Sequence, residues 1–419
     1  MSMVLQKSIG KYLLLFLFTV NISVFAQNTQ TDIFEPSFKS LQVTDPNNLL
    51  GQPIIVTTNA DSRIKISFDE LAEDNRYLRY RLVHCNSNWQ RSDISEIDYI
   101  DGFNEGHIHS YELSYNTLAH YVHYSLELPN EDMMPLLSGN YLVEIFDEND
   151  PNRVLLQARF MLSEDKARMS PSVTTRTDYD YNNKHQQVSL NVNLEGLDIE
   201  NAYTDLRLVI IQNGKVNSAH VIDTPLRVTP DGVVYEHQSD LIFPAGNEYR
   251  RFDIANVRYP GMNVSNFEYI DPYYNAMLEC DYPRISSRYQ YDSDQSGRFY
   301  VDELNATEPN LQADYILTFF TLKCPELDED VYLDGDFVLR KFDSDSKMIY
   351  DDTIGAYIKT LLLKQGMYNY QYTTKSDLFN PIEGDFYETA NEYLMLLYYR
   401  PMGARYDRLI GTTVIYSDK

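Results

Sequence analysis

Segments in which apolar and polar residues alternate recur along the whole chain, and they limit its fold more than any other feature. Examples lie at residues 64–68, 122–128, 188–194 and 315–322. Successive side chains of a β-strand point to opposite faces, so this pattern indicates strands with one face buried. Turn-forming pairs also separate apolar runs, as hairpins require, at Asn213-Gly214, Asp231-Gly232 and Asp334-Gly335. Because no segment keeps a helical period over a dozen residues, we predict an all-β fold of stacked sandwiches.

The length and two polar stretches suggest how the strands are divided among domains. A chain of 419 residues corresponds to roughly two to four domains. Residues 163–171 and 304–310 are polar, contain proline and are typical of linkers. We therefore expect three tandem immunoglobulin-like or early-set β-sandwich domains, at residues 30–165, 170–305 and 310–419.

The first residues have the layout of a cleavable export signal. Two lysines precede the apolar stretch 12–20, and Val24-Phe25-Ala26 then supplies the small residues that a signal peptidase reads before Gln27. The apolar stretch is shorter than the roughly 20 residues that span a bilayer. No cysteine follows it that could carry a lipid. We expect a soluble exported protein from which the signal peptide, residues 1–26, has been removed.

The charge balance excludes one class of partner. The chain has 62 acidic and 35 basic residues and a net charge of -27. Residues 1–26 contain two lysines and no acid, so the mature charge is -27 - 2 = -29. Such a charge repels nucleic acids and anionic lipid surfaces, and we predict neither nucleic-acid binding nor membrane insertion.

The number of cysteines does not decide whether the protein contains a disulfide bond. Three cysteines in a chain of this length do not form a disulfide framework. An exported protein can form one bridge among Cys85, Cys280 and Cys324, with one thiol left over, and the sequence does not select the pair.

One segment, residues 292–303, matches the calcium-binding loop pattern. It has side-chain oxygens at loop positions 1, 3 and 5, Gly297 at position 6 and Glu303 at position 12. A calcium loop of this kind needs a helix on each side. Here Tyr289-Gln-Tyr291 precedes the segment and Phe299-Tyr-Val301 alternates like a strand inside it. We predict a β-hairpin with Ser296-Gly297 at its turn, and no metal site.

The histidines and the catalytic motifs give no candidate enzyme. His107, His109, His120 and His123 lack the further ligands that a zinc site needs. His84 and Cys85 are neighbours on a predicted strand, so they point to opposite faces and cannot act as a dyad. There is no Gly-x-Ser-x-Gly elbow, phosphate-binding glycine loop or His-Glu-x-x-His motif. We predict a protein without enzymatic activity, cofactor or catalytic residues. The alternative that the sequence leaves open is a glycosidase, whose two carboxylates would come from distant strands.

Aromatic residues suggest a second class of function. The chain has 35 tyrosines and one tryptophan, Trp89, which we expect to be buried in the first domain. Tyr368, Tyr370 and Tyr372 share one side of a predicted strand. Residues 331–372 resemble an early-set immunoglobulin domain of the glycogen-binding kind, a family that stacks sugars on exposed tryptophans. The loop after Gly335-Asp-Phe337 has no tryptophan, so a structural role is favoured, with carbohydrate or surface-glycan binding as the alternative.

Several distinctive blocks follow one another from about Phe38 to the C-terminus. They include Tyr80-Arg-Leu-Val-His-Cys-Asn-Ser-Asn-Trp89, Asp98-Tyr-Ile-Asp-Gly-Phe103, Gly139-Asn-Tyr141, Pro244-Ala-Gly-Asn-Glu-Tyr-Arg-Arg-Phe-Asp253, Leu363-Lys-Gln-Gly-Met-Tyr-Asn-Tyr370 and Arg405-Tyr-Asp-Arg-Leu-Ile-Gly411. In this order the blocks resemble the plug protein family of the type IX secretion system of Bacteroidota. The resemblance implies a periplasmic protein that caps the periplasmic mouth of a giant outer-membrane β-barrel translocon. The residues that would contact this partner are not indicated by the sequence.

Overall fold

The computed structural model describes residues 29–375 and 380–417. The expected signal peptide, residues 1–26, and its cleavage before Gln27 lie outside the described residues. The all-β prediction is confirmed, because the helices among the described residues are single turns. They are the α-helices α1 (Glu96–Tyr99), α2 (Ala202–Asp205) and α3 (Pro309–Gln312) and the 3-10 turns η1 (Val216–Ser218), η2 (Ser239–Leu241) and η3 (Asp336–Val338).

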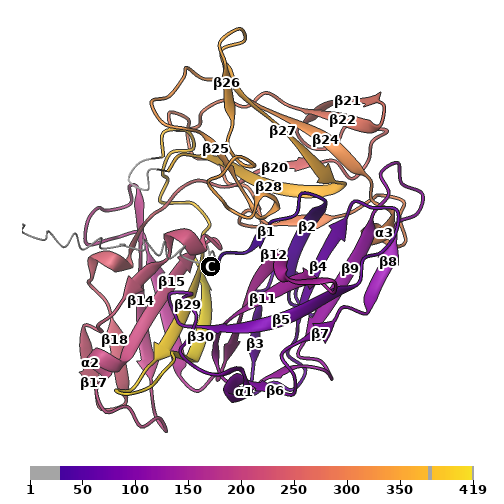
Figure 1. Ribbon diagram of the computed structural model, residues 1–419. Helices are drawn as coiled ribbons and strands as arrows, with labels where there is room; N and C mark the ends of the chain where they lie inside the picture. Colours follow the sequence, from indigo (N-terminus) through magenta and orange to yellow (C-terminus); the bar gives the residue numbers. More distant parts are fainter. Residues whose placement is uncertain (1–28, 376–379, 418–419) are drawn as a thin grey trace, which may run out of the picture.

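The first unit is a two-sheet sandwich at the lower right of Figure 1. One sheet has the order β1-β12-β11-β5-β7 with β3 beside β12, the other has the order β2-β4-β9-β8, and β10 and β6 form a separate pair. The strands are β1 (Asp32–Ile33), β2 (Phe38–Thr44), β3 (Ile54–Val56), β4 (Ile64–Glu70), β5 (Leu78–Cys85), β6 (Ile100–Asp101), β7 (Gly106–His107), β8 (Ser110–Leu113), β9 (Val122–Leu128), β10 (Met134–Pro135), β11 (Gly139–Asp147) and β12 (Asp150–Ser163).

The second unit lies beside the first and combines distant parts of the chain (Figure 1). One sheet has the order β13-β14-β18-β17 with β19 beside β14, and the other has the order β16-β15-β29-β30. The strands are β13 (Arg168–Thr174), β14 (His185–Asn193), β15 (Leu206–Gln212), β16 (His220–Ile222), β17 (Arg227–Thr229), β18 (Gly232–Tyr235), β19 (Ile242–Pro244), β29 (Glu392–Tyr399) and β30 (Arg408–Tyr416).

The third unit lies above the other two in the view of Figure 1. One sheet has the order β20-β28-β23 with β25 beside β28, and the other has the order β21-β22-β24-β27-β26. The strands are β20 (Arg250–Asp253), β21 (Val264–Ile270), β22 (Tyr273–Leu278), β23 (Phe299–Val301), β24 (Tyr315–Leu322), β25 (Tyr332–Asp334), β26 (Ile349–Asp351), β27 (Ala356–Lys364) and β28 (Gly366–Thr373).

The strand pairing divides the chain differently from the expected boundaries at 170–305 and 310–419. The last two strands, β29 and β30, complete a sheet with β15, as in the pairs Leu208↔Leu397 and Ile210↔Met395. Conversely, β20 and β23 pair with β28, and β22 pairs with β24, so these strands belong to the third unit. The third unit is thus inserted between two parts of the second. An alternating pattern marks where a strand lies and not which strand it pairs with, so the sequence did not indicate this insertion.

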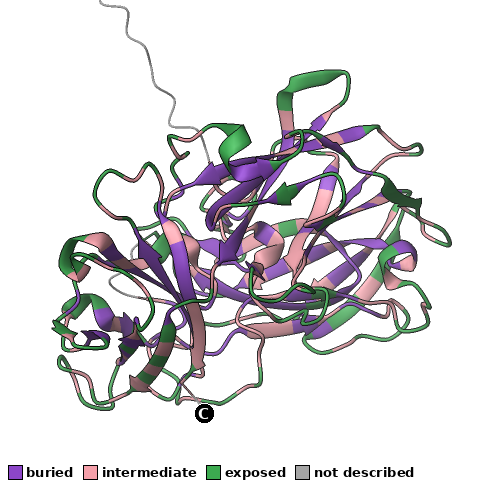
Figure 2. Ribbon diagram, turned by 90° about the horizontal axis from the view of Figure 1, so that it is seen from below, coloured by how far each residue is buried: buried purple, intermediate pink, exposed green. Residues whose placement is uncertain are grey.

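Each unit has its own hydrophobic core, and a fourth cluster lies between the first and second units. In that cluster Val83, Leu142 and Met161 from the first unit meet residues such as Ile211 and Leu396 from the second. The sheet containing β5 and β11 is therefore covered on both faces where it meets the second unit, along β11 and the second half of β5. Figure 2 shows that buried strands run through the interior of the molecule.

Trp89 is buried as expected, with 8% of its surface exposed, but it belongs to the cluster between the units. The first unit supplies only part of the apolar surface that buries Trp89, because the cluster also contains Ile211 and Leu396 of the second unit. The guanidinium group of Arg159 lies 4.2 Å from the centre of its ring.

Candidate functional site at the junction of the three units

The first and third units are joined by a buried ion pair. The Lys364 ammonium on β27 donates to Asp69 Oδ2 on β4 at 2.5 Å and to the Asn310 carbonyl at 2.6 Å. Asp69 also accepts a hydrogen bond from the Tyr315 hydroxyl at 2.7 Å and lies 2.6 Å from His123 Nδ1. Both charged side chains are 1% exposed. Burial by itself would raise the pKa of Asp69, but the Lys364 and His123 contacts outweigh it and hold this pKa below its usual range.

A second set of contacts surrounds this pair and fits the two units together. The Lys364 ammonium lies 4.0 Å from the centre of the Tyr121 ring, and the Tyr121 hydroxyl donates to the Ala313 carbonyl at 2.9 Å. The Asp314 carboxylate accepts the backbone N–H groups of Leu118 and Ala119 at 2.8 and 3.1 Å. A loop of the first unit is thereby fixed to the start of β24, so relative movement of the two units would break several buried bonds.

One carboxylate connects all three units. Glu392 on β29 of the second unit accepts a hydrogen bond from Gln52 of the first unit and pairs with Arg298 of the third at 2.9 Å. The Glu392 side chain is 3% exposed and that of Arg298 is 17% exposed. Nearby, Gln42 Nε2 donates to the Phe299 carbonyl at 3.0 Å, which adds a contact between the first and third units.

The second and third units are also joined through Asp334 at the end of β25. Its carboxylate lies 3.1 Å from the Lys215 ammonium of the second unit and accepts the Tyr249 hydroxyl at 3.2 Å. Burial would raise the pKa of Asp334, but the charges of Lys215 and Arg340 hold it below its usual range. The pair therefore remains charged at neutral pH.

The first and second units are held by polar contacts at the edge of their shared apolar cluster. Glu164 accepts two hydrogen bonds from Arg408, at 2.8 and 2.7 Å. The Tyr398 hydroxyl donates to Asn140 Oδ1 at 2.6 Å. Burial would raise the pKa of Glu164, but hydrogen bonds from Arg408, Lys166 and Ser138 lower it to about 2.

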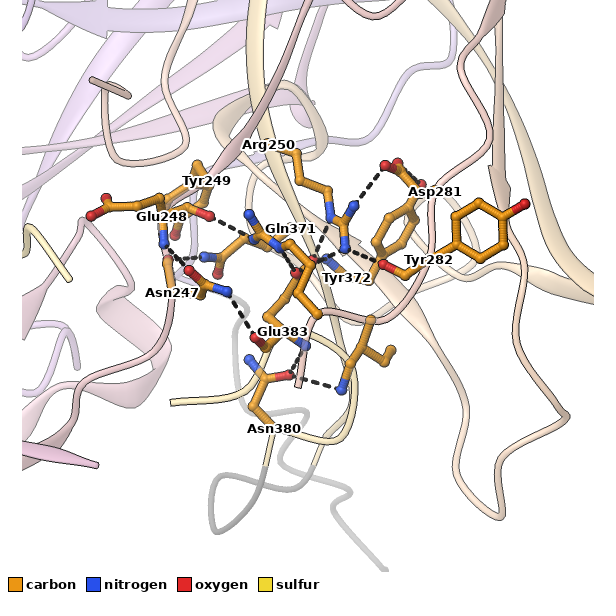
Figure 3. A network of polar contacts seen from close by, with 12 residues as sticks. Asn247, Glu248, Tyr249, Arg250, Asp281, Tyr282, Gln371, Tyr372, Asn380 and Glu383 are labelled. Carbon is orange, nitrogen blue, oxygen red and sulfur yellow. Dashed lines mark hydrogen bonds and ion pairs between the residues drawn. The ribbon is translucent and has the colours of Figure 1, made fainter. Parts of the chain in front are cut away.

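A dense polar network lies inside the third unit (Figure 3). Arg250 Nη1 donates to Asp281 at 2.6 Å and its Nε donates to Glu383 at 2.9 Å, while Arg284 donates to the other Glu383 oxygen at 2.6 Å. The Tyr372 hydroxyl donates to Asp281 Oδ2 at 2.7 Å. Burial would raise the pKa of Glu383, which is 0% exposed, but Arg250 and Arg284 lower it. A carboxylate held between two arginines has no proton to donate at neutral pH, so the pairing of Glu383 with Arg250 and Arg284 is suited to rigidity and not to acid–base chemistry.

The calcium-like segment 292–303 does not form the predicted hairpin. Ser296 and Gly297 do form a turn, but β23 pairs with β28, and residues 289–291 are not a strand. Asp292 pairs with Arg251, and Asp294 accepts the backbone N–H groups of Tyr249 and Ser296. In residues 29–375 and 380–417, no group of three His, Cys, Asp or Glu side chains is placed to hold a metal ion.

The histidines and cysteines singled out in the sequence do not gather into one site, although the rings of His107 and His109 stack with their centres 5.7 Å apart. His84 hydrogen bonds to Ser92 and the Ser138 carbonyl, and burial lowers its pKa to about 4. Cys85 lies in the cluster between the units, where burial raises the pKa of its thiol to about 12. The structure thus places this pair on opposite faces, as predicted. His107 and His109 are exposed, and all three cysteines are free thiols.

Sequence reasoning missed the residues that join the units. The available signal was a charged residue inside an apolar strand: Lys364 directly follows three leucines at residues 361–363. A lysine in such a position is buried only when it has a partner. That partner, Asp69, is 295 residues away, and no pattern in the sequence links the two.

Comparisons with known proteins agree with this architecture. A family model described as the type 9 secretion system plug protein 1st domain matches residues 38–164, from the start of β2 to just beyond β12. The crystal structure of a hypothetical protein from Parabacteroides merdae ATCC 43184 superposes with a TM-score of 0.90. The two chains are 40% identical, and the match covers 92% of this chain and 99% of the other.

Two further findings complete the comparison. No curated protein matches this sequence. Every helix within the described part of the chain is too short or too polar to cross a membrane.

Proposed function

We propose that this protein is the periplasmic plug of the translocon, because the chain belongs to the type IX secretion system plug protein family. In this role it would occupy the periplasmic mouth of the outer-membrane barrel and limit leakage while no cargo passes. The family is a non-catalytic structural one and supports a role related to type IX secretion. The plug acts by binding and steric exclusion and uses no metal, nucleotide or covalent chemistry.

The observation that carries the proposal is the locked junction of the three units. A plug has to remain a rigid body that is wider than the pore it closes. Asp69–Lys364, with both side chains 1% exposed, joins the first and third units. Glu392–Arg298 and Asp334–Lys215 join the second and third units through carboxylates that are 3% and 8% exposed, while the Lys215 side chain is 31% exposed. Removing one partner of such a pair leaves an uncompensated buried charge, at a cost of about 3–5 kcal/mol, so the units resist separation.

The alternative, a glycan-binding protein, is not supported by the tyrosines that suggested it. Tyr368, Tyr370 and Tyr372 do share one face, but each is at most 2% exposed and packs in the core of the third unit. The Tyr370 and Tyr372 hydroxyls both donate to Asp281. Rings in this position cannot stack on a sugar.

Deletion strains test the proposed function. Loss of the gene should make the outer membrane leaky to hydrophilic molecules that it normally excludes, because the barrel then stays open. Deleting the barrel gene as well should abolish the leak, because the pore is gone. A leak that persists without the barrel, or normal permeability in the single deletion, would contradict the proposal.

A further inference from the structure

Two hollows adjoin at the junction of the units, and Arg159 on β12 lines both of them. The first hollow has a volume of about 210 Å³ and walls from all three units, including Leu41, Leu394 and Phe299. The second has a volume of about 220 Å³ and lies between the first and second units. Trp89 also lines both hollows, so the pair formed by Arg159 and Trp89 lies where the two meet.

Arg159 is a cation without an anionic partner among the described residues. Its Nε donates to the Thr29 carbonyl at 2.6 Å, and this is the one hydrogen bond of the guanidinium group within residues 29–375 and 380–417. The titratable groups around it are the Cys85 thiol and the Tyr398 hydroxyl, and burial raises the pKa of both, so they are uncharged at neutral pH. Burial lowers the pKa of Arg159 to about 10, which leaves it charged at neutral pH. Its Nη groups are therefore the donors of a cation that has no matching anion in this part of the chain.

The other charged residues in the walls are paired. The Arg298 guanidinium lies 2.9 Å from the Glu392 carboxylate, and Arg340 Nε lies 2.7 Å from the Asp336 carboxylate. No further Asp, Glu, Lys or Arg of the described chain lines either hollow. The unmatched charge is that of Arg159, so the ligand that complements these walls carries a single negative charge.

Apolar side chains form the greater part of the surface of the first hollow. Leu41, Met161, Ile211 and Leu394 line it, and each is at most 5% exposed. Leu49, which is 53% exposed, also lines it, so the hollow opens to solvent. Sites for drug-sized ligands usually have volumes of roughly 300–1,000 Å³. A hollow of about 210 Å³ therefore suits a smaller molecule with a hydrocarbon body.

We propose that Arg159 and the first hollow form a binding site for a small apolar monocarboxylate. The carboxylate accepts hydrogen bonds from the Arg159 Nη groups, because a planar guanidinium group can donate two parallel bonds to a carboxylate. The hydrocarbon part lies in the first hollow against Leu41, Met161 and Leu394. Because these walls belong to the first and second units, the ligand adds to the contacts that hold the two units together. The inference does not rest on the proposed function.

Titration of the purified full-length protein with hexanoate tests the site. Hexanoate should bind saturably with a dissociation constant of roughly 1 mM or lower. It should also change the fluorescence of Trp89, which is the only tryptophan of the chain and lies against Arg159. 1-Hexanol has the same hydrocarbon chain without the charge, and it should bind at least about tenfold more weakly, because it cannot form the charge-assisted bonds to Arg159.

Variants of Arg159 separate the charge from the apolar walls. Arg159→Met should weaken hexanoate binding by about tenfold or more and leave 1-hexanol binding unchanged, whereas Arg159→Lys should keep part of the hexanoate affinity. Arg153→Met is the matched control, because Arg153 lies on the same strand, is 63% exposed and pairs with Glu35. This control should bind hexanoate like the wild type. Calorimetry measures binding to the variants, since the loss of Arg159 also alters the surroundings of Trp89.

Three outcomes would overturn the proposal. They are hexanoate binding no tighter than 1-hexanol, equal hexanoate binding by Arg159→Met and the wild type, and saturable binding without a change in Trp89 fluorescence, which would place the ligand elsewhere. If Arg159→Met does not fold, the comparison of hexanoate with 1-hexanol on the wild type still decides. The measurements use the purified protein without the barrel, so failure here leaves the proposed function standing.

Discussion

Asp69 and Glu164 are both carboxylates at contacts between units, but their surroundings differ. Asp69 and its partner Lys364 are each 1% exposed, so their attraction is offset by a large desolvation cost. Glu164 and Arg408 are 13% and 29% exposed and form a bidentate pair that loses less hydration. The second pair is therefore the better source of net stability, and the first mainly fixes how the units fit together.

The pKa of Glu164 predicts a specific dependence of stability on pH. Its value in the folded protein, about 2, lies below the ordinary value of 4.5. The folded state therefore binds this proton less readily than the unfolded state, and the stabilisation is present above pH 4.5 and lost as the pH falls toward 2. The difference of about 2.5 between the two values corresponds to about 3 kcal/mol.

Glu164→Gln tests this dependence through chemical denaturation at a series of pH values. The variant should be less stable than the wild type by about 3 kcal/mol at pH 7, and the gap should close as the pH approaches about 2. Glu195→Gln is a control, because Glu195 is exposed and should change the stability little at any pH. A gap between wild type and Glu164→Gln that stays constant with pH would contradict the assignment.

At the scale of elements, the sequence predicted the strands that have one buried face, but not the strands that are covered on both faces. Strands such as β4 and β9 alternate, because one face meets a core and the other is less buried, and they were predicted. In contrast, β11 and β29 are buried along almost their whole length and do not alternate. Their second faces are covered by each other's units, a contact between residues far apart in the chain. Local periodicity carries no information about such a contact.

Contacts between distant parts of the chain also limited what the sequence could predict about the candidate site. That His84 and Cys85 point to opposite faces followed from strand geometry alone, and in the structure Cys85 lies in the cluster between the units while His84 hydrogen bonds to Ser92 and the Ser138 carbonyl. The buried pair of Asp69 and Lys364 depends on how two units dock, and so does the position of Arg159 where two hollows meet. Both are properties of tertiary structure that neither spacing nor composition encodes.

Pairing between distant strands predicts that the fragment 27–308 will fold only in part. In this fragment β15 lacks β29, while β20 and β23 lack β28, their only partner strand among the described residues. Only the first unit keeps both of its sheets and its core. Limited proteolysis should therefore reduce fragment 27–308 to a product that matches fragment 27–165. A resistant product that spans residues 170–305 would contradict this expectation.

At the scale of the whole molecule, the buried pairs between units predict cooperative unfolding. Each unit contacts both of the others through charges that cannot be exposed singly without loss of stability. The three units should therefore unfold together, although each has its own core.

Calorimetry of the full-length protein tests this cooperativity. The wild type should show one transition, and Lys364→Ala should lower the stability of the whole molecule by about 3–5 kcal/mol, because Asp69 is left buried without its partner. Lys347→Ala is the matched control: Lys347 pairs with Asp330, but the two side chains are 44% and 55% exposed, and its loss should change the stability little. Two or more transitions in the wild type, with only one moved by Lys364→Ala, would contradict cooperative unfolding.

The insertion of the third unit into the second also sets the order in which the chain can mature. Synthesis delivers the N-terminal residues first, and domains generally fold as they become available. The first unit can close early, but the second waits for β29 and β30, which follow the whole of the third unit in the sequence. Until they arrive, β15 presents an unpaired edge and the apolar face of the second unit is open. A premature stop before β29 would thus leave an incomplete second unit that is open to proteolysis and aggregation, so the second unit can fold only in molecules that contain the whole of the third.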